Sequence, residues 1–312
     1  MQAKIEVDGL VRRFGPLTAV DDVTFQVTQG EVLGFLGPNG AGKSTTMKMI
    51  TGYLTPSAGQ VRVCGFDVVQ EPLSAKALIG YLPEGAPAYP DMTPASFLAF
   101  CARTRGLAAE TARQRIAQAV DTVAIGDVLE QSIDTLSKGY KRRVGLAQAI
   151  LHDPPVLILD EPTDGLDPNQ KHEVRTLIAN MATEKAIIIS THILEEVDAV
   201  CTRAMIIDKG RMVADGTPEM LQARSPGHNA VVVRTSADGA EAALFELADV
   251  ARVETLAAGT YRIYPRAGRQ PLAAVAELAR RRGWSIDHLA VEAGRLDEVF
   301  RQITGGGRRH AA

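Results

Sequence analysis

One segment near the N-terminus combines glycines, a lysine and hydroxyls in a spacing suited to holding phosphate. The sequence GPNGAGKST at residues 37–45 fits the pattern GxxxxGK[ST]. Its glycines allow backbone conformations closed to other residues, so successive N–H groups can point at phosphate oxygens. Lys43 would reach the β and γ phosphates, and the Ser44 hydroxyl would bind Mg²⁺. The expected phosphate-binding residues are Gly37, Pro38, Asn39, Gly40, Ala41, Gly42, Lys43, Ser44 and Thr45.

An acidic pair, Asp160 and Glu161, directly follows the apolar run VLIL at residues 156–159. A fully apolar strand is typical of a parallel sheet buried on both faces, and such sheets bind ligands at the carboxyl ends of their strands. Asp160 would therefore hold Mg²⁺, directly or through water. Glu161 would orient and deprotonate the water that attacks the γ-phosphate. The alternative is an acidic turn without a chemical role, which the nearby glycine segment disfavours.

The flanking sequence indicates which elements must position these groups. Residues 31–36 are a short apolar run that favours a strand, and residues 45–54 have a helical pattern. A strand, a glycine loop and a helix together place free N–H groups and the positive end of the helix dipole at the phosphate. Residues 1–36 alternate apolar and polar side chains, which predicts a partly exposed antiparallel sheet. Residues 95–150 are predicted to be helical.

These motifs resemble the nucleotide-binding subunits of ABC transporters over about residues 4–223. The segment LSKGYKRRVGLAQAI resembles the ABC signature and its helix, which distinguishes this family from other P-loop ATPases. The usual form is LSGGQ. Here Lys138 and Tyr140 replace the first of its two glycines and the glutamine, as in the gliding-motility and drug-export type. The resemblance implies that Ser137 and the Gly139 amide, at a helix N-terminus, donate to a γ-phosphate held by a second subunit.

Three further positions are similar to the family pattern. Phe14 in RRFG lies where the family stacks an aromatic ring on adenine, although a single phenylalanine is also a common core residue. Asp167 in the sequence GLD resembles the D-loop, which couples the two ATP sites. His192 follows the apolar run at residues 186–190, as the switch histidine does. There it would contact the γ-phosphate and the attacking water.

The Q-loop departs from the family pattern, because Glu84 in IGYLPEGAPAY stands where glutamine is usual. A carboxylate is a harder ligand than an amide and would still bind Mg²⁺. It also adds negative charge near the γ-phosphate. We expect Glu84 to link the metal site to the membrane subunit through the loop at residues 85–94.

The patterns and the resemblance together predict an α/β chain with two unequal domains. Residues 1–224 are expected to form a P-loop ABC ATPase cassette with a mixed sheet core, an antiparallel β subdomain and an α-helical subdomain at about 90–150. A turn-rich segment, SPGHN, follows it. Residues 229–304 show the order βαββαβ with a closing helix, which suggests a small α+β ferredoxin-like accessory domain. The tail at residues 305–312 is expected to be mobile.

Composition limits the classes of function. The chain has 312 residues, of which 46% are hydrophobic and 23% charged, as in ordinary globular proteins. A net charge of −3 gives no general attraction to nucleic acid, so no nucleic-acid partner is expected. No apolar stretch approaches the ~20 residues of a membrane-spanning helix, and the N-terminus does not follow the order of a signal peptide. Three cysteines without CxxC spacing indicate neither a disulfide framework nor a zinc site.

The leading interpretation is an ATP-hydrolysing subunit of an ABC transporter, an exporter by its signature variant, at the cytoplasmic face of the membrane. The resemblance implies ATP and Mg²⁺, a homodimer or a dimer with a homologous cassette, and a separate integral membrane permease. One alternative is a single-cassette ATPase of the translation or DNA-repair type, which the lack of zinc spacing and of a coiled-coil insertion disfavours. Another is a regulatory scaffold that barely turns ATP over, which the intact set of Asp160, Glu161 and His192 disfavours.

Overall fold

The computed structural model describes residues 2–305, and in it strand β3 (Val32–Leu36) leads into the glycine segment. All residues of β3 are buried, and it lies inside a six-stranded sheet of order β10-β9-β3-β8-β7-β6. Its neighbours β8 (Ala186–Thr191) and β9 (Arg203–Asp208) both run parallel to it. The expectation that the antiparallel sheet extends to residue 36 is therefore wrong. Because both faces of β3 are covered, it belongs to the buried parallel sheet.

The other strands of this sheet align the acidic pair with the glycine loop. They are β6 (Ile79–Leu82), β7 (Val156–Asp160) and the antiparallel edge strand β10 (Arg211–Gly216). Leu36 pairs with Thr191, and Asp160 pairs with Ser190. Since β3, β7 and β8 are parallel, their carboxyl ends meet at one edge of the sheet, where ligands of such sheets bind.

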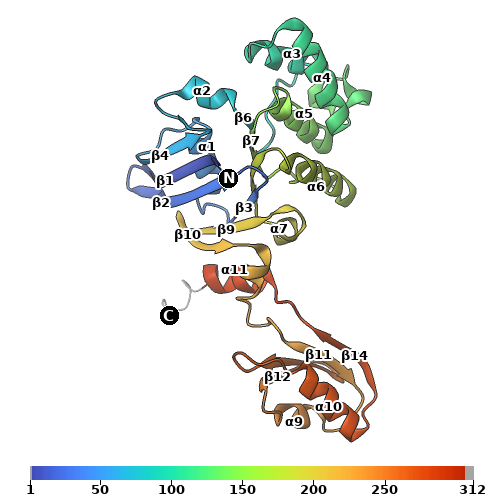
Figure 1. Cartoon of the computed structure of the whole chain (residues 1–312). Coiled ribbons are helices and arrows are strands. Elements are labelled where there is room, and N and C mark those ends of the chain that lie inside the picture. The colour runs from blue at the N-terminus through green and yellow to red at the C-terminus, as the bar shows by residue number, and fades with distance from the viewer. Residues whose placement is uncertain (1, 306–312) are drawn as a thin grey trace. The chain divides into compact units, whose positions relative to one another are not determined.

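Helix α1 (Lys43–Ile50) follows the glycine loop and lies between two sheets (Figure 1). It contacts β7 on one side and strands β2 and β4 of a four-stranded antiparallel sheet on the other. That sheet has the order β2-β1-β4-β5, formed by β1 (Ala3–Phe14), β2 (Leu17–Thr28), β4 (Ala58–Val63) and β5 (Phe66–Asp67). Met47, Met49 and Ile50 are completely buried. Burial of apolar surface on both sides thus fixes the helix that begins at Lys43.

Three longer helices form the helical part of the first unit. They are α3 (Pro94–Thr104), α4 (Ala109–Val123) and α5 (Lys138–Ile150), which pack together (Figure 1). Helix α5 also packs directly on β6. The close approach is possible because Gly80 has no side chain, and a Cβ there would collide with the carbonyl oxygen of Ala149. The short helix α2 (Pro72–Ala77) precedes β6, and the 3₁₀ turns η1 (Gly126–Val128) and η2 (Ile133–Thr135) precede α5. Helices α6 (Pro168–Ala182) and α7 (Leu194–Val200) contact each other, and α7 packs on β3 and β8.

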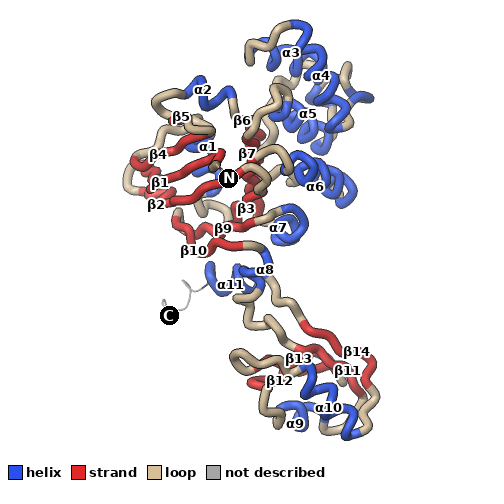
Figure 2. The backbone as a smooth tube through the Cα atoms, viewed as in Figure 1, coloured by secondary structure: helices blue, strands red, loops and turns tan. Residues whose placement is uncertain are grey.

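The chain divides into two compact units, Met1–Thr217 and Pro218–Ala312, and the second has a core of its own. Its elements are α8 (Pro218–Gln222), β11 (Val231–Thr235), α9 (Ala240–Phe245), β12 (Val250–Ala257), β13 (Thr260–Pro265), α10 (Leu272–Arg282), β14 (Ile286–Val291) and α11 (Leu296–Gly305) (Figure 2). The sheet order is β12-β13-β11-β14, and every neighbouring pair is antiparallel. Leu244 of α9 and Val275 of α10 pack on it. Helix α8 contacts α11, and both belong to the second unit.

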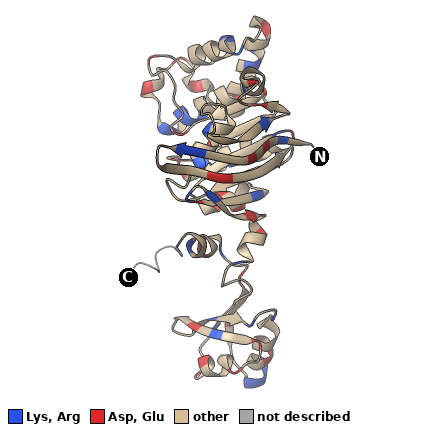
Figure 3. Ribbon diagram, turned by 90° about the vertical axis from the view of Figure 1, so that its left-hand side faces the viewer, with Lys and Arg blue, Asp and Glu red and all other residues tan. Residues whose placement is uncertain are grey.

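Charges of both signs are interspersed along the ribbon of each unit (Figure 3). Within residues 2–305, no helix is long and apolar enough to cross a membrane. The tail expected at residues 305–312 lies outside the described residues except for Gly305, which ends α11.

Replacing Gly80 with alanine tests the seating of α5 on β6. The new Cβ would lie 2.2 Å from the carbonyl oxygen of Ala149, so the helix or the strand must shift. We expect the free energy of unfolding, measured by urea denaturation, to fall by about 2 kcal/mol. Gly126→Ala is the control, since a Cβ at Gly126 meets no atom within 4 Å. Equal stability of the two variants would contradict the close packing.

Candidate active site

Close backbone approaches shape the glycine loop between β3 and α1. Gly42 has a φ of 110°, and a Cβ there would lie 2.6 Å from the carbonyl oxygen of Ala19. A Cβ on Gly37 would lie 2.5 Å from the carbonyl oxygen of Ile207. Glycine is therefore required twice, once for the left-handed backbone and once for the contact with the neighbouring strand. These contacts with β2 and β9 hold the loop at the edge of the sheet.

The Lys43 ammonium lies within its own loop, and the residue as a whole is only 6% exposed. Its Nζ donates hydrogen bonds to the carbonyl oxygens of Gly37 at 2.7 Å and Pro38 at 3.2 Å. Burial lowers the pKa of Lys43, and the negative charges of Glu161, Asp160 and Glu84 oppose that shift. The lysine thus lies in the field of carboxylates that come from the ends of two other strands.

Asp160, at the end of β7, is completely buried. Its Oδ1 accepts hydrogen bonds from Ser44 Oγ at 3.3 Å and from Ser190 Oγ. Its Oδ2 is buried and has no hydrogen-bond partner within residues 2–305. A buried carboxylate oxygen without a partner, beside a hydroxyl, is a set of hard oxygen ligands of the kind that Mg²⁺ binds. The residues present therefore fit a magnesium ion.

Glu161 has a φ of 50°, a left-handed backbone that residues other than glycine seldom adopt. Its N–H donates to the carbonyl oxygen of Ser190 at 3.2 Å and to Ser190 Oγ at 3.0 Å. Its Oε1 lies 3.1 Å from Nδ1 of His192, whose side chain is 48% exposed. The turn thus directs a carboxylate and an imidazole at each other beside solvent. Such a pair can take up a proton and orient a water molecule.

Two residues that the sequence did not single out hold this arrangement together. Ser190 bonds both Asp160 and the Glu161 backbone, as described above. Glu196 of α7 is 2% exposed and accepts hydrogen bonds from Thr191 Oγ1 at 2.6 Å and from Thr163 Oγ1. It thereby ties the loop after β7 to the end of β8. Its sequence signal is weak because it adjoins a second glutamate, Glu195, and only burial distinguishes the two.

The signature segment begins helix α5, with Ser137 as the N-cap residue. Ser137 Oγ accepts a hydrogen bond from the Tyr140 N–H at 3.3 Å. A Cβ on Gly139 would lie 2.6 Å from Oε1 of Gln170, so the signature packs against the start of α6. Asp167 caps α6 in a reciprocal capping box with Gln170. In the described part of the chain, no hydrogen bond joins the signature to the glycine loop.

Phe14 and Glu84 lie less close to the phosphate site. Phe14 ends β1 and is 44% exposed, and the Arg12 guanidinium carbon lies 4.5 Å from its ring centroid. Glu84 is exposed in the loop after β6, and its charge acts on Lys43 without a direct bond. The structure brings together Lys43, Ser44, Asp160, Glu161 and His192.

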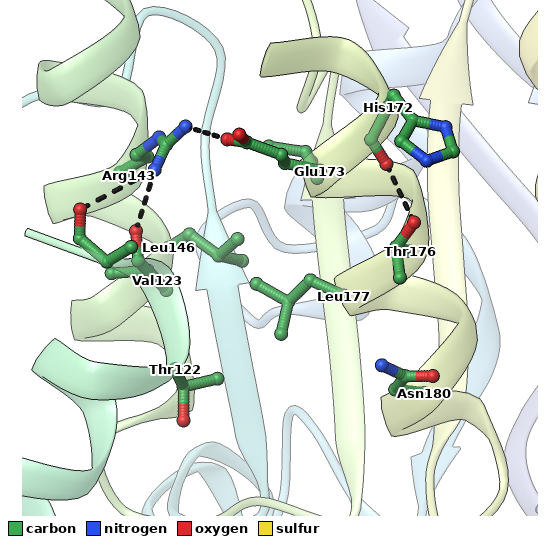
Figure 4. Close-up of a pocket in the computed structure, with 11 residues that line it drawn as sticks. Thr122, Val123, Arg143, Leu146, His172, Glu173, Thr176, Leu177 and Asn180 are labelled. Atoms are coloured by element: carbon green, nitrogen blue, oxygen red, sulfur yellow. Dashed lines mark hydrogen bonds and ion pairs between the residues drawn. The ribbon is translucent and has the colours of Figure 1, made fainter. Parts of the chain in front are cut away.

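A pocket of about 400 Å³ lies elsewhere in the first unit, between α4, α5 and α6 (Figure 4). Arg143 spans it, donating to Glu173 of α6 and to the carbonyl oxygens of Val123 and Ala124. None of the candidate site residues lines this pocket. The chemistry therefore rests on the strand ends around the glycine loop.

The chain is similar to known nucleotide-binding proteins. Residues 20–164 match the family described as ABC transporter. A Nod factor export ATP-binding protein of Paraburkholderia xenovorans is 36% identical over 233 residues, which cover 74% of this chain and 77% of that protein. A daunorubicin resistance ATP-binding protein of Streptomyces coeruleorubidus is 34% identical and covers 98% of this chain, which in turn covers 97% of it.

A solved structure of an ATP-binding subunit of an ABC transporter has the same fold as much of the chain. The two superpose with a TM-score of 0.65 at 31% identity, over 70% of this chain and 92% of that structure. The expected ATPase cassette is therefore confirmed.

Ser190→Ala tests whether the serine positions the acidic pair. The change removes a hydrogen bond to Asp160 and one acceptor for the Glu161 N–H. We expect kcat for ATP hydrolysis to fall about tenfold, since a lost hydrogen bond to a charged group is of order 1.5 kcal/mol. Thr176→Ala is the control, because that hydroxyl donates to the His172 carbonyl oxygen within α6. An unchanged kcat in Ser190→Ala would rule out the positioning role.

Proposed function

The chain belongs to the ATP-binding proteins of ABC transporters, and from this premise we propose that it hydrolyses ATP at the strand ends around Lys43 to power an exporter. The observation that carries the proposal is the contact of Glu161 with His192 beside the buried Asp160. As an ATPase of this family, the chain binds ATP and couples its hydrolysis to transport. Its relatives support this function over a role in translation, DNA repair or scaffolding.

The phosphates of ATP would be bound by the glycine loop. The N–H groups of residues 37–45 and of the first turn of α1 provide donors for them. Lys43 would exchange its bonds with the loop carbonyls for bonds with the β and γ phosphates. Phe14 would stack on the adenine ring, for which its exposed ring is available.

Ser44 and Asp160 would hold Mg²⁺, with Glu84 as a further carboxylate near it. A bound magnesium ion supplies charge neutralisation for the β and γ phosphates. Glu161 would orient the attacking water and take up its proton, and His192 would hold the Glu161 carboxylate in the required direction. The φ of 50° at Glu161 supports this role, because strained backbone of this kind clusters at functional sites.

The dimer follows from the signature segment. Ser137 and Gly139 lie at the N-terminal end of α5, where free N–H groups and the helix dipole favour a phosphate. A second copy, or a homologous cassette, would bring these donors to the γ-phosphate of the first. Asp167, which packs beside them through Gln170, would couple the two sites. Mutual completion of two sites is an isologous arrangement, the commonest form of dimer.

The membrane partner and the direction of transport are proposed from the relatives. One is named for Nod factor export, and the other, which matches nearly the whole chain, for daunorubicin resistance. We propose that this chain works with a separate integral membrane permease at the cytoplasmic face and contacts it through the loop at residues 85–94. Export is then the expected direction.

We infer an ATPase cassette at residues 1–224 and a ferredoxin-like accessory domain at residues 229–304. The second unit supports this with its βαββαβ order and its antiparallel sheet of order β12-β13-β11-β14. The daunorubicin resistance relative extends over this unit as well, so the accessory domain is part of the proposed exporter type.

Glu161→Gln tests the assignment of the general base. The amide keeps the shape of the side chain but cannot take up a proton, so kcat should fall by about a hundredfold or more. ATP binding should persist, and an ATP-dependent dimer should accumulate in size-exclusion chromatography. Glu195→Gln, an exposed change of the same charge on α7, is the control. An unchanged kcat in Glu161→Gln would exclude Glu161 as the base.

Purification from native membranes tests the partner. We expect a polytopic membrane protein to co-purify in stoichiometric amount after mild detergent extraction. Recovery with ribosomes or DNA instead would contradict the transport function and favour the alternative.

A further inference from the structure

Arg142 is a buried cation that the function proposed above does not use. It lies on α5 and is 6% exposed. Its Nη1 is buried and has no hydrogen-bond partner within residues 2–305. A buried charge is costly unless it is paired and hydrogen-bonded. The unpartnered Nη1 therefore points to a partner that Arg142 binds in another state of the protein.

The packing of α5 on β6 shows where that partner lies. A Cβ on Gly80 would touch the carbonyl oxygen of Ala149, whereas a Cβ on Gly145 would lie 2.7 Å from Leu82 and 2.8 Å from Ala86. Residues earlier in α5 thus contact residues later in β6 and in the loop that follows it. The helix runs antiparallel to β6 and continues along the loop that follows it.

Arg142 shares the face of α5 that packs on this loop. Residues 142, 145 and 149 are spaced by three and four, so they lie on one side of the helix. One turn beyond the contact of Gly145 with Leu82 and Ala86, the same face carries Arg142. Glu84 lies midway between those two contacted residues. The fold therefore places the arginine along the loop after β6, one helical turn from the stretch that carries this glutamate.

Four acidic groups act on the charge of Arg142. Burial lowers the pKa of Arg142, and Asp164, Glu161, Asp160 and Glu84 oppose that shift. Three of these carboxylates act on Lys43 as well, so the lysine and the arginine are two buried cations in one acidic centre. Asp160 already bonds two serine hydroxyls, and Glu161 faces His192. Glu84 and Asp164 are exposed, and in the described part of the chain their carboxylates form no hydrogen bond.

We propose that Arg142 is a positioning residue of the ATP site, which binds the Glu84 carboxylate when nucleotide is present. The planar guanidinium matches a carboxylate with two parallel hydrogen bonds. The pair cancels the charge that Glu84 would otherwise add beside the phosphates, and it connects the signature helix to the loop after β6. The inference rests on the proposed function in one respect, the place of Glu84 near the nucleotide.

A double-mutant cycle tests the pair, with Arg142→Gln, Glu84→Gln and the variant that carries both. The probe is a fluorescent ATP analogue with Mg²⁺, and its dissociation constant is measured by titration alongside kcat and KM for ATP. Arg142→Gln should weaken binding about tenfold, because it leaves the Glu84 charge unpaired near the phosphates. The double variant, with two neutral amides, should return to within about threefold of the unmodified protein. Additive effects in this cycle would overturn the proposal.

Two further variants show whether the effect belongs to the Arg142–Glu84 pair or to neighbouring charges. Arg143→Gln removes the same charge from the next residue of α5, but Arg143 points to Glu173 of α6 (Figure 4). Glu84→Gln should not rescue any loss of binding in Arg143→Gln. Asp164→Asn tests the other exposed carboxylate. If it rescues Arg142→Gln and Glu84→Gln does not, Arg142 belongs to the loop after β7 and the proposal fails.

The cycle also remains informative if Arg142→Gln does not fold. Arg142→Lys keeps the charge but loses the planar fork, and it should weaken binding less and be rescued in the same direction by Glu84→Gln. Failure of the proposed function would be seen separately, as an unchanged kcat in Glu161→Gln. The binding cycle does not depend on that result, because it measures affinity and not hydrolysis.

Discussion

The buried carboxylate of Asp160 is the interaction on which the active site depends. Its Oδ1 accepts from hydroxyls on two other elements, Ser44 of α1 and Ser190 of β8. These bonds hold the glycine loop, β7 and β8 in one register at the edge of the parallel sheet. Because the other oxygen stays free in the interior, the cost of burying the charge is offset fully only when a cation is bound. The fold thus positions a negatively charged oxygen where the metal ion that accompanies the nucleotide would bind.

A second constraint is the contact of α5 with β6, where glycines allow backbone and helix to touch. Since the helix begins directly after the signature serine, this contact sets the direction in which the donors at Ser137 point. It also determines how deeply the Arg142 side chain is buried. Overfilling such an interface forces side chains and backbone to shift. Packing far from the phosphates therefore controls the geometry of the site, and the signature cannot be understood as a local motif alone.

Much of the site could be predicted because its residues follow each other along short segments. The glycine loop, the acidic pair after β7 and the histidine after β8 are each next to an apolar run that had to become a buried strand. The assignment of residues 31–36 to the antiparallel sheet was wrong, since alternation in the preceding strands does not show where one sheet ends. Ser190 and Glu196 were missed, because nothing local separates them from ordinary polar residues. Their role arises from burial against residues far away in the chain.

The sequence by itself determined the chemistry of this protein, because phosphate binding, metal binding and proton transfer need particular side chains at particular local spacings. It also determined the order of strands and helices through their apolar periodicity. Only the tertiary structure decided which charges meet. Strand pairing brings Glu161 to His192, and helix packing brings Arg142 into an acidic centre. Electrostatic interactions depend on distance and burial, and neither quantity exists until the chain has folded.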